Sequence, residues 1–221
     1  VHFMPKSSRA LNGVGIFYME NGDYSSAIAA FKKSIELDPR GFRAYANLGL
    51  AYHKSTNNIL AEEVLERGLG LKLKNTEILI NLATVKVVLG KMNEGLQLLN
   101  QAVILEPHWA EPYLARGNLF LKMKRYDDAY QDFLKAIQVR PDYPEPLNNL
   151  GVLFGELNRF DEAILNFRKA LRIDPKNKEA LINVATAYYF LKDYENARKY
   201  ARMASGLGVI LPEFLLPIIK S

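Results

Sequence analysis

The sequence predicts an all-α fold, a solenoid of six antiparallel helix pairs, because three series of residues recur in phase every 34 positions. A repeat of this length is one supersecondary unit that cannot bury its apolar face alone, so copies stack on one another. The first series marks small anchors: Gly15, Gly49, Ala83, Gly117, Gly151 and Ala185. The second marks small residues in the following helix: Ala27, Ala61, Gly95, Ala129, Ala163 and Ala197. The third marks the ends of the copies: Pro39, Leu73, Pro107, Pro141, Pro175 and Val209.

These series divide the chain into a lead-in, six copies and a tail. We expect a lead-in over 1–7 and an apolar cap over 212–221. The six copies between them are expected over 8–41, 42–75, 76–109, 110–143, 144–177 and 178–211.

Within each copy the apolar spacing predicts two helices joined by a tight turn. In the fifth copy Leu147, Leu150 and Phe154 recur at helical spacing, Asn158 interrupts them, and the same period then resumes. Pro175 follows because proline cannot continue a helix. The small anchors stand where the two helices must approach closely.

Copies two and three depart from the pattern. Thr56 and Asn58 replace the usual turn residues, Leu73 replaces proline, and Lys86 stands where the other copies carry an aromatic residue. We therefore predict that these two copies pack less tightly than copies four and five.

The fourth copy carries a matched pair of charges. Arg116 stands where other copies have Val or Leu, and Asp132 stands where they have no acid. We expect these two side chains to meet across the helix pair in a structural role, since a partly buried ion pair is weak evidence for stability.

The apolar tail from Leu211 to Lys220 needs an explanation, because a solvated tail would be polar. A terminal repeat must cover its exposed interface, so we expect Phe214, Leu215, Ile218 and Ile219 to fold against the sixth copy. The alternative is that this segment enters the groove of a second molecule and drives self-association.

The repeat resembles the tetratricopeptide repeat over about nine-tenths of the chain. The fourth copy carries the family pattern in full: Tyr113, Gly117, Phe120, Tyr126, Ala129, Phe133, Ala136 and Pro141. The resemblance implies a right-handed superhelical solenoid whose first helices line a concave groove. It also implies a protein or peptide partner.

Composition limits the classes of function. Residues 1–110 carry 12 basic and 10 acidic side chains and residues 111–221 carry 17 and 14, so no concentrated basic stripe indicates a nucleic-acid partner. No apolar run is long enough for a membrane span. No secretory signal is visible, and we expect a cytoplasmic protein. Cysteine is absent, which excludes disulfides, thiol catalysis and Cys-ligated zinc. The start at Val1 is what a fragment or a processed form would show.

We find no motif for catalysis, a metal or a cofactor. The histidines His2, His53 and His108 lie too far apart to share a metal, and no phosphate loop or nucleophile motif is present. The sequence therefore predicts a non-enzymatic chain with no cofactor.

Asparagines mark the expected groove. Asn47, Asn81, Asn149 and Asn183 stand two residues before an anchor, and an amide offers both a donor and an acceptor to a peptide unit. They resemble the asparagine ladder of O-linked N-acetylglucosamine transferase, which implies that they hold an extended polypeptide. Ala115 interrupts the ladder. Alternatively, the asparagines bond the backbone of the neighbouring copy.

Further residues share this face. We expect Leu50, Asn118, Leu121 and Tyr189, with Val88 beside them, to contact a peptide, because contiguous apolar surface marks interaction sites. Part of this stripe would otherwise pack between adjacent helices. A carboxylate clamp for an acidic chain end is not expected, because Asn81 stands where an arginine would be needed and the helix starts carry Glu77, Glu111, Glu145 and Glu179. These glutamates form an acidic edge that favours a basic ligand; alternatively, they only stabilise the helix starts.

The sequence thus predicts a protein-interaction scaffold that binds an extended or helical peptide segment in a concave groove. Two alternatives stay open. The chain is the recognition arm of a larger enzyme, such as a glycosyltransferase, or it is an assembly factor that associates with itself.

Overall fold

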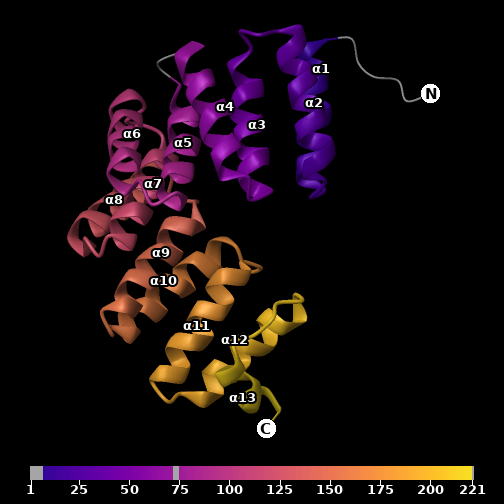
Figure 1. The fold of residues 1–221 in the computed structure, drawn as a ribbon. Coiled ribbons are helices and arrows are strands. Elements are labelled where there is room, and N and C mark those ends of the chain that lie inside the picture. The colour runs from indigo at the N-terminus through magenta and orange to yellow at the C-terminus, as the bar shows by residue number, and fades with distance from the viewer. Residues whose placement is uncertain (1–6, 72–74, 221) are drawn as a thin grey trace. The chain divides into compact units, whose positions relative to one another are not determined.

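The computed structural model describes residues 7–71 and 75–220, and all regular structure in these ranges is helical (Figure 1). Thirteen α-helices and one short 3-10 helix occur there, and no strand. Contacts group the chain into two compact units, Val1–Pro107 and His108–Ser221, which we describe separately.

The first unit holds three helix pairs. In chain order the helices are α1 Ser8–Glu20, α2 Tyr24–Leu37, α3 Phe42–Lys54, α4 Asn58–Leu71, α5 Thr76–Val88 and α6 Met92–Leu105.

The second unit repeats this plan and adds a short C-terminal segment. Its helices are α7 Ala110–Lys122, α8 Tyr126–Val139, α9 Pro144–Glu156, α10 Phe160–Ile173, α11 Lys178–Phe190, α12 Tyr194–Gly206, η1 Glu213–Leu215 and α13 Leu216–Lys220.

The first helix of each pair forms the inner layer of its unit. Each helix packs against the next along the chain within its unit, and α3 also contacts α1 and α5. In the second unit α9 likewise contacts α7 and α11, whereas no described second helix contacts another second helix. The first helices are therefore closer together, and each unit curves with them on its inner side.

A left-handed turn residue joins the two helices of each pair. Gly22, Thr56, Gly90, Lys124, Asn158 and Lys192 all have positive φ, and they recur at the repeat period. In the second pair the amide of Thr56 donates to the His53 carbonyl at 2.9 Å, and the amide of Asn57 donates to the Tyr52 carbonyl at 2.8 Å. These bonds close the end of α3 in the manner of a Schellman motif. Thr56 adopts φ 66° although its side chain is β-branched.

Small anchors allow the paired helices to touch. A Cβ atom added to Gly15 would lie 2.4 Å from the Phe31 ring, and one added to Gly151 would lie 2.4 Å from the Phe167 ring. Both phenylalanines are buried. The glycines therefore provide the space that these rings fill.

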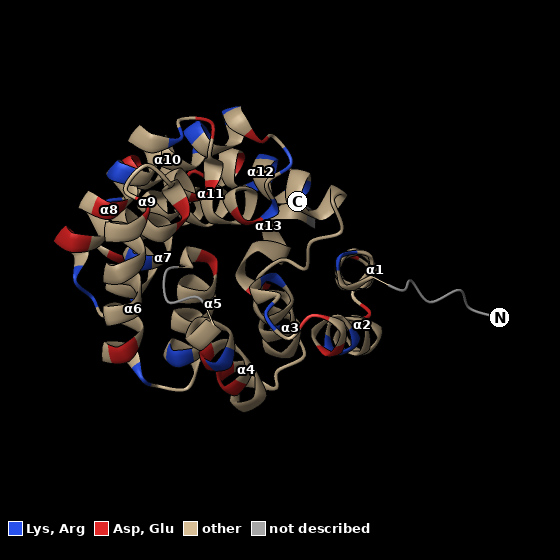
Figure 2. Ribbon diagram, turned by 90° about the horizontal axis from the view of Figure 1, so that it is seen from above, with Lys and Arg blue, Asp and Glu red and all other residues tan. Residues whose placement is uncertain are grey.

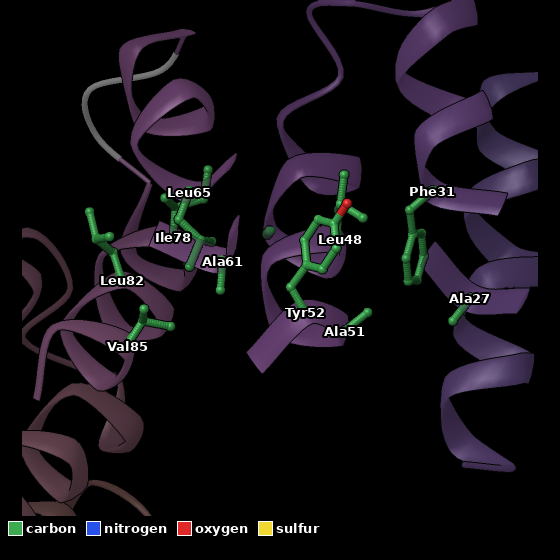
Figure 3. Close-up of a cluster of buried hydrophobic side chains, with 11 residues drawn as sticks. Ala27, Phe31, Leu48, Ala51, Tyr52, Ala61, Leu65, Ile78, Leu82 and Val85 are labelled. Carbon is green, nitrogen blue, oxygen red and sulfur yellow. The ribbon is translucent and has the colours of Figure 1, made fainter. Parts of the chain in front are cut away.

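Apolar side chains from successive helices fill the space between the layers. In the first unit one cluster extends from Ala27 and Phe31 on α2 through α3 and α4 to Leu82 and Val85 on α5 (Figure 3). The core is therefore a continuous chain of contacts between neighbouring pairs, as expected for stacked repeats.

The segment after α12 packs on its own chain. Leu211 and Leu215 are buried in a cluster with Leu181 of α11 and Ala201 of α12, and Ile218 and Ile219 pack against this cluster. Leu215 is 0% exposed.

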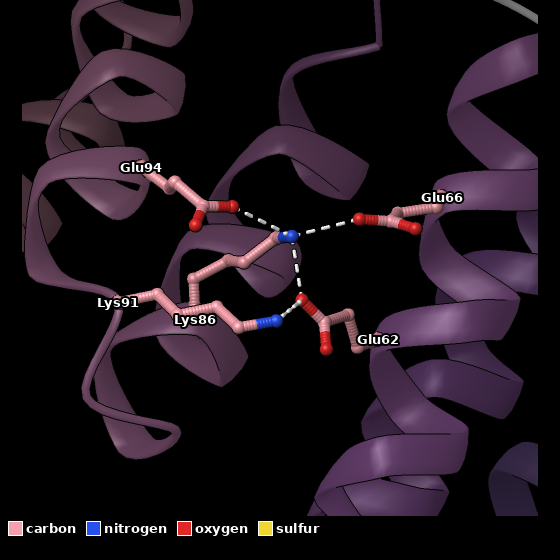
Figure 4. A network of polar contacts seen from close by, with 5 residues as sticks. All are labelled: Glu62, Glu66, Lys86, Lys91 and Glu94. Atoms are coloured by element: carbon pink, nitrogen blue, oxygen red, sulfur yellow. Dashed lines mark hydrogen bonds and ion pairs between the residues drawn. The ribbon is translucent and has the colours of Figure 1, made fainter.

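Two charged contacts lie within the helix layers. The Arg116 guanidinium donates two hydrogen bonds to Asp132, at 2.7 and 2.8 Å, which confirms the expected pair. Lys86 is buried, and its Nζ lies 2.5 Å from Glu62, 2.7 Å from Glu66 and 2.9 Å from Glu94 (Figure 4). Lys86 thus joins α4, α5 and α6.

Elsewhere on the two units both signs of charge are interspersed along the helices (Figure 2). None of the described helices is long and apolar enough to cross a membrane.

Candidate functional site

The predicted asparagines lie on the inner helices, and three of them bond an amide of the preceding pair. The Asn47 side chain donates to Oδ1 of Asn12 at 3.0 Å. Asn183 donates to Oδ1 of Asn148 at 3.0 Å, and Asn149 donates to Oδ1 of Asn118 at 2.6 Å. The partner of each asparagine is therefore a side-chain amide of the neighbouring copy. The alternative interpretation of the sequence expected the backbone of that copy as the partner.

These bonds leave part of each amide available to a ligand. The amide nitrogens of Asn47 and Asn183 each carry a second hydrogen, and their Oδ1 atoms accept no hydrogen bond from the described residues. One donor and one acceptor are what a peptide unit requires. The bond to the neighbouring copy also fixes the orientation of the amide, which lowers the entropic cost of binding.

Sequence reasoning missed Asn12 and Asn148. They stand four repeat periods apart, and each lies 35 residues before a ladder asparagine. That spacing was the signal for these two residues in the sequence. The spacing alone does not predict a contact, because the rotation between neighbouring pairs decides which side chains meet.

A hollow on the inner side of the first unit contains two predicted site residues. It lies between α3 and α5 and has a volume of about 150 Å³. We call it the unit 1 hollow, and its lining is Gly49, Leu50, His53, Lys54, Leu65, Asn81, Thr84 and Val85. The His53 ring is held by a 2.7 Å hydrogen bond between its Nδ1 and Oδ1 of Asn58. Asn81 makes no hydrogen bond to another described residue, so its amide is free to bind a ligand.

The second unit has a corresponding hollow between α9 and α11, of about 170 Å³. We call it the unit 2 hollow, and its lining is Val152, Gly155, Phe160, Phe167, Asn183, Thr186, Ala187 and Phe190. Six of these residues stand three repeat periods after residues of the unit 1 hollow, and Asn183 corresponds to Asn81. The repeat therefore builds the same kind of recess twice.

The two hollows differ in chemistry. In the unit 1 hollow His53 and Lys54 provide polar groups. In the unit 2 hollow the Phe160 and Phe190 rings stack, with centroids 5.4 Å apart and planes at 16°. Phe190 is 55% exposed, so this aromatic wall is open to a ligand.

The remaining predicted contact residues lie in different places. Tyr189 packs against Phe214 of the C-terminal segment, with ring centroids 5.0 Å apart. Val88 is exposed and Leu121 is half-buried, and neither lines the two hollows. Asn118 is engaged with Asn149. The structure thus gathers Leu50 with Asn81, and it places Asn183 in one hollow with the stacked Phe160 and Phe190 rings.

The described residues contain no group of three or more His, Asp or Glu side chains arranged to hold a metal ion.

Comparisons with known proteins place the chain among helical repeat proteins. Family models described as "TPR repeat" and "Tetratricopeptide repeat" match residues 17–55, 42–75, 110–176 and 155–205.

Two curated relatives show partial similarity. The DnaJ homolog subfamily C member 7 homolog of Dictyostelium discoideum is 25% identical over 141 residues, which are 57% of this chain and 26% of the relative. The UDP-N-acetylglucosamine–peptide N-acetylglucosaminyltransferase of Giardia intestinalis is 29% identical over 125 residues, 55% of this chain and 8% of the relative. The chain thus spans about a quarter or less of the length of these relatives.

Solved structures share the fold. PilW, a type IV pilus biogenesis factor, superposes with a TM-score of 0.81 at 18% identity over 98% of this chain and 100% of its own. YrrB, a repeat protein described as having an unusual peptide-binding site, gives a TM-score of 0.55 at 23% identity over 77% of this chain and 88% of its own.

Proposed function

This chain belongs to the tetratricopeptide repeat proteins, and from that premise we propose that it is a protein-interaction scaffold that binds an extended or helical peptide segment along its inner helices. The observation that carries this proposal is the pair of corresponding hollows, each of which contains a ladder asparagine. The asparagines would hold the peptide backbone, while Leu50 and Phe190 would select its side chains.

The proposal predicts that the asparagines matter whatever the peptide sequence. Peptides would be selected from a phage-displayed library on the purified chain, and the affinity of two unrelated peptides would be measured by fluorescence anisotropy. We expect Asn81→Ala/Asn183→Ala to weaken both by at least about fivefold, since a lost hydrogen bond removes about 1 kcal/mol.

The matched control is Asn93→Ala, because Asn93 is exposed on the outer helix α6. This variant should bind both peptides as the unmodified chain does. Unchanged affinity in Asn81→Ala/Asn183→Ala would remove the asparagines from the proposal.

A second candidate function is the recognition arm of a larger enzyme. It is favoured by the match to the Giardia glycosyltransferase, of which this chain covers 8%. The complete reading frame decides this question, since a catalytic domain joined to these repeats would establish it.

Self-association through the C-terminal segment is less well supported. Leu215 is buried against α11 and α12 of the same chain, so this segment has a partner within one molecule. Light scattering over a range of concentrations separates a monomer from an assembly.

A further inference from the structure

A further hollow lies in the first unit, away from the unit 1 hollow. It has a volume of about 550 Å³ and lies between the first turns of α1 and α3 and the end of α2. Three arginines line it, Arg9, Arg40 and Arg43. We call it the arginine hollow.

The three arginines are free to bind a ligand. Each is exposed, and none makes an ion pair or a side-chain hydrogen bond with another described residue. Asp38 is the one acidic residue in the lining, and its Oδ1 accepts a hydrogen bond from the Arg40 amide at 3.1 Å. The hollow therefore carries an excess of positive charge that no described neighbour neutralises.

The repeat register shows that this charge is specific to the first two pairs. Arg9 and Arg43 occupy the position at which the later inner helices carry Glu77, Glu111, Glu145 and Glu179. The first turns of α1 and α3 contain no acidic residue, whereas those of α5, α7, α9 and α11 each contain one. Acids compensate the positive end of a helix dipole, so the starts of α1 and α3 are the two uncompensated ones among these helices.

A neutral donor completes the lining. Oδ1 of Asn12 accepts the hydrogen bond from Asn47. The side-chain nitrogen of Asn12 is therefore an available donor, since no described residue accepts a hydrogen bond from it. The lining also contains the Ser8 hydroxyl, 2.9 Å from the buried Ser34 hydroxyl. Guanidinium and amide donors without acceptors form a site for an oxyanion.

We propose that the arginine hollow binds an oxyanion carried by the partner peptide, either a phosphorylated side chain or a carboxylate. This inference rests on the proposed function, because the hydrogen bond between Asn12 and Asn47 joins the arginine hollow to the asparagines that would hold the peptide backbone. The partner segment accordingly carries negative charge where it reaches α1 and α3. This differs from the basic ligand that the acidic edge of the later copies favours.

The first test uses inorganic phosphate alone, followed by NMR of the arginine Nε–H groups in the full chain. We expect phosphate to shift the signals of Arg9, Arg40 and Arg43, and Arg9→Gln/Arg43→Gln to weaken binding by at least about tenfold, because each charge-assisted hydrogen bond contributes about that factor. Arg9→Lys/Arg43→Lys keeps the charge and should retain part of the affinity.

The matched control is Arg172→Gln/Lys176→Gln, which removes the same charge from exposed positions in the second unit. It should leave phosphate binding unchanged. Equal affinity in Arg9→Gln/Arg43→Gln and the unmodified chain, or an equal loss in the control, would overturn the site.

The second test identifies the source of the oxyanion. Three peptides of one polar sequence carry phosphoserine, glutamate or serine at the centre, and their binding is measured by fluorescence anisotropy. Tighter binding of the phosphoserine or of the glutamate peptide, lost in Arg9→Gln/Arg43→Gln, supports that source, and equal binding of all three overturns the proposal for a peptide. Phosphate binding at the arginines together with unchanged affinity in Asn81→Ala/Asn183→Ala would refute the asparagine proposal and leave the anion site standing.

Discussion

At the scale of single residues, Lys86 shows how one repeat position can be filled in two ways. Glu62 and Lys86 stand two repeat periods before Tyr130 and Phe154, whose rings meet edge to face with centroids 6.1 Å apart. The same contact between neighbouring pairs is therefore an ion pair in the first unit and an aromatic pair in the second. Lys86 is buried because Glu62, Glu66 and Glu94 supply its acceptors.

The pKa values follow from these contacts. Burial alone would lower the pKa of Lys86, but hydrogen bonds to the three carboxylates outweigh it and raise the pKa above its ordinary value of 10.5. Burial would likewise raise the pKa of Glu62, but the bonds from Lys86 and Lys91 lower it below 4.5. The contribution of Glu62 to stability is thus full above pH 4.5 and is lost as the pH falls through its lowered pKa, and that of Lys86 is lost only as the pH rises through its raised pKa.

At neutral pH both groups are charged, so the ion pair can be tested by replacing it with the aromatic pair of the second unit. We expect Lys86→Phe to lower the free energy of unfolding by about 1–3 kcal/mol, because it leaves the half-buried Glu62 carboxylate with fewer partners. Adding Glu62→Tyr should recover most of that loss, since the double variant copies Tyr130 and Phe154. Urea unfolding of the two single variants and the double variant measures the coupling.

The control is Lys91→Met, whose side chain is 41% exposed and which should change the free energy of unfolding by less than about 1 kcal/mol. If the double variant loses as much free energy of unfolding as the two single variants together, the ion pair and the aromatic pair are not interchangeable.

The same residues show what could be predicted from the sequence. The meeting of Arg116 and Asp132 was predictable, because both lie within one copy and the geometry of a helix pair is fixed by the repeat. The acceptors of Lys86 and the amide partners of Asn47 and Asn183 were not, because they belong to neighbouring copies. Periodicity places a residue on a face, but the rotation between copies selects its partner.

At the scale of elements, each glycine anchor lies against a large side chain sixteen positions later in the chain. Gly151 faces Phe167 and Gly49 faces Leu65, so glycine leaves the room that either side chain fills. The helix pairs were predictable from the sequence for this reason: each carries a small residue where its two helices cross. The position of the Phe214 ring against Tyr189 was not predictable, since the tail lies outside the repeat.

This matching predicts the effect of a single methyl group. We expect Gly151→Ala to lower the free energy of unfolding by about 1–3 kcal/mol, because the new Cβ would lie 2.4 Å from the buried Phe167 ring. Urea unfolding checks this loss, and Gly155→Ala is the control, because a Cβ atom there meets nothing within 4 Å. Equal stability of Gly151→Ala and Gly155→Ala would contradict the argument.

At the scale of the whole molecule, the stability of a stacked repeat is a sum of the stabilities of its copies and of their interfaces. Copies of unequal stability should therefore differ in how readily they unfold locally. In the second copy Thr56 holds a positive φ of 66° with a β-branched side chain, which is more strained than the unbranched Lys124 and Asn158 at the same turn of the fourth and fifth copies. In the fourth and fifth copies Arg125 stacks over the Phe120 ring and Arg159 over the Phe154 ring.

We accordingly expect amides of α4 and α6 to exchange with solvent at least about tenfold faster than those of α8 and α10, as a difference of about 1.4 kcal/mol in local opening requires. Hydrogen exchange of the intact chain, read by mass spectrometry, measures this difference. Thr56→Gly should slow exchange in α4 and leave α10 unchanged, because glycine adopts the left-handed conformation without strain. Uniform protection of all four helices would mean that the turn at Thr56 does not weaken the second copy.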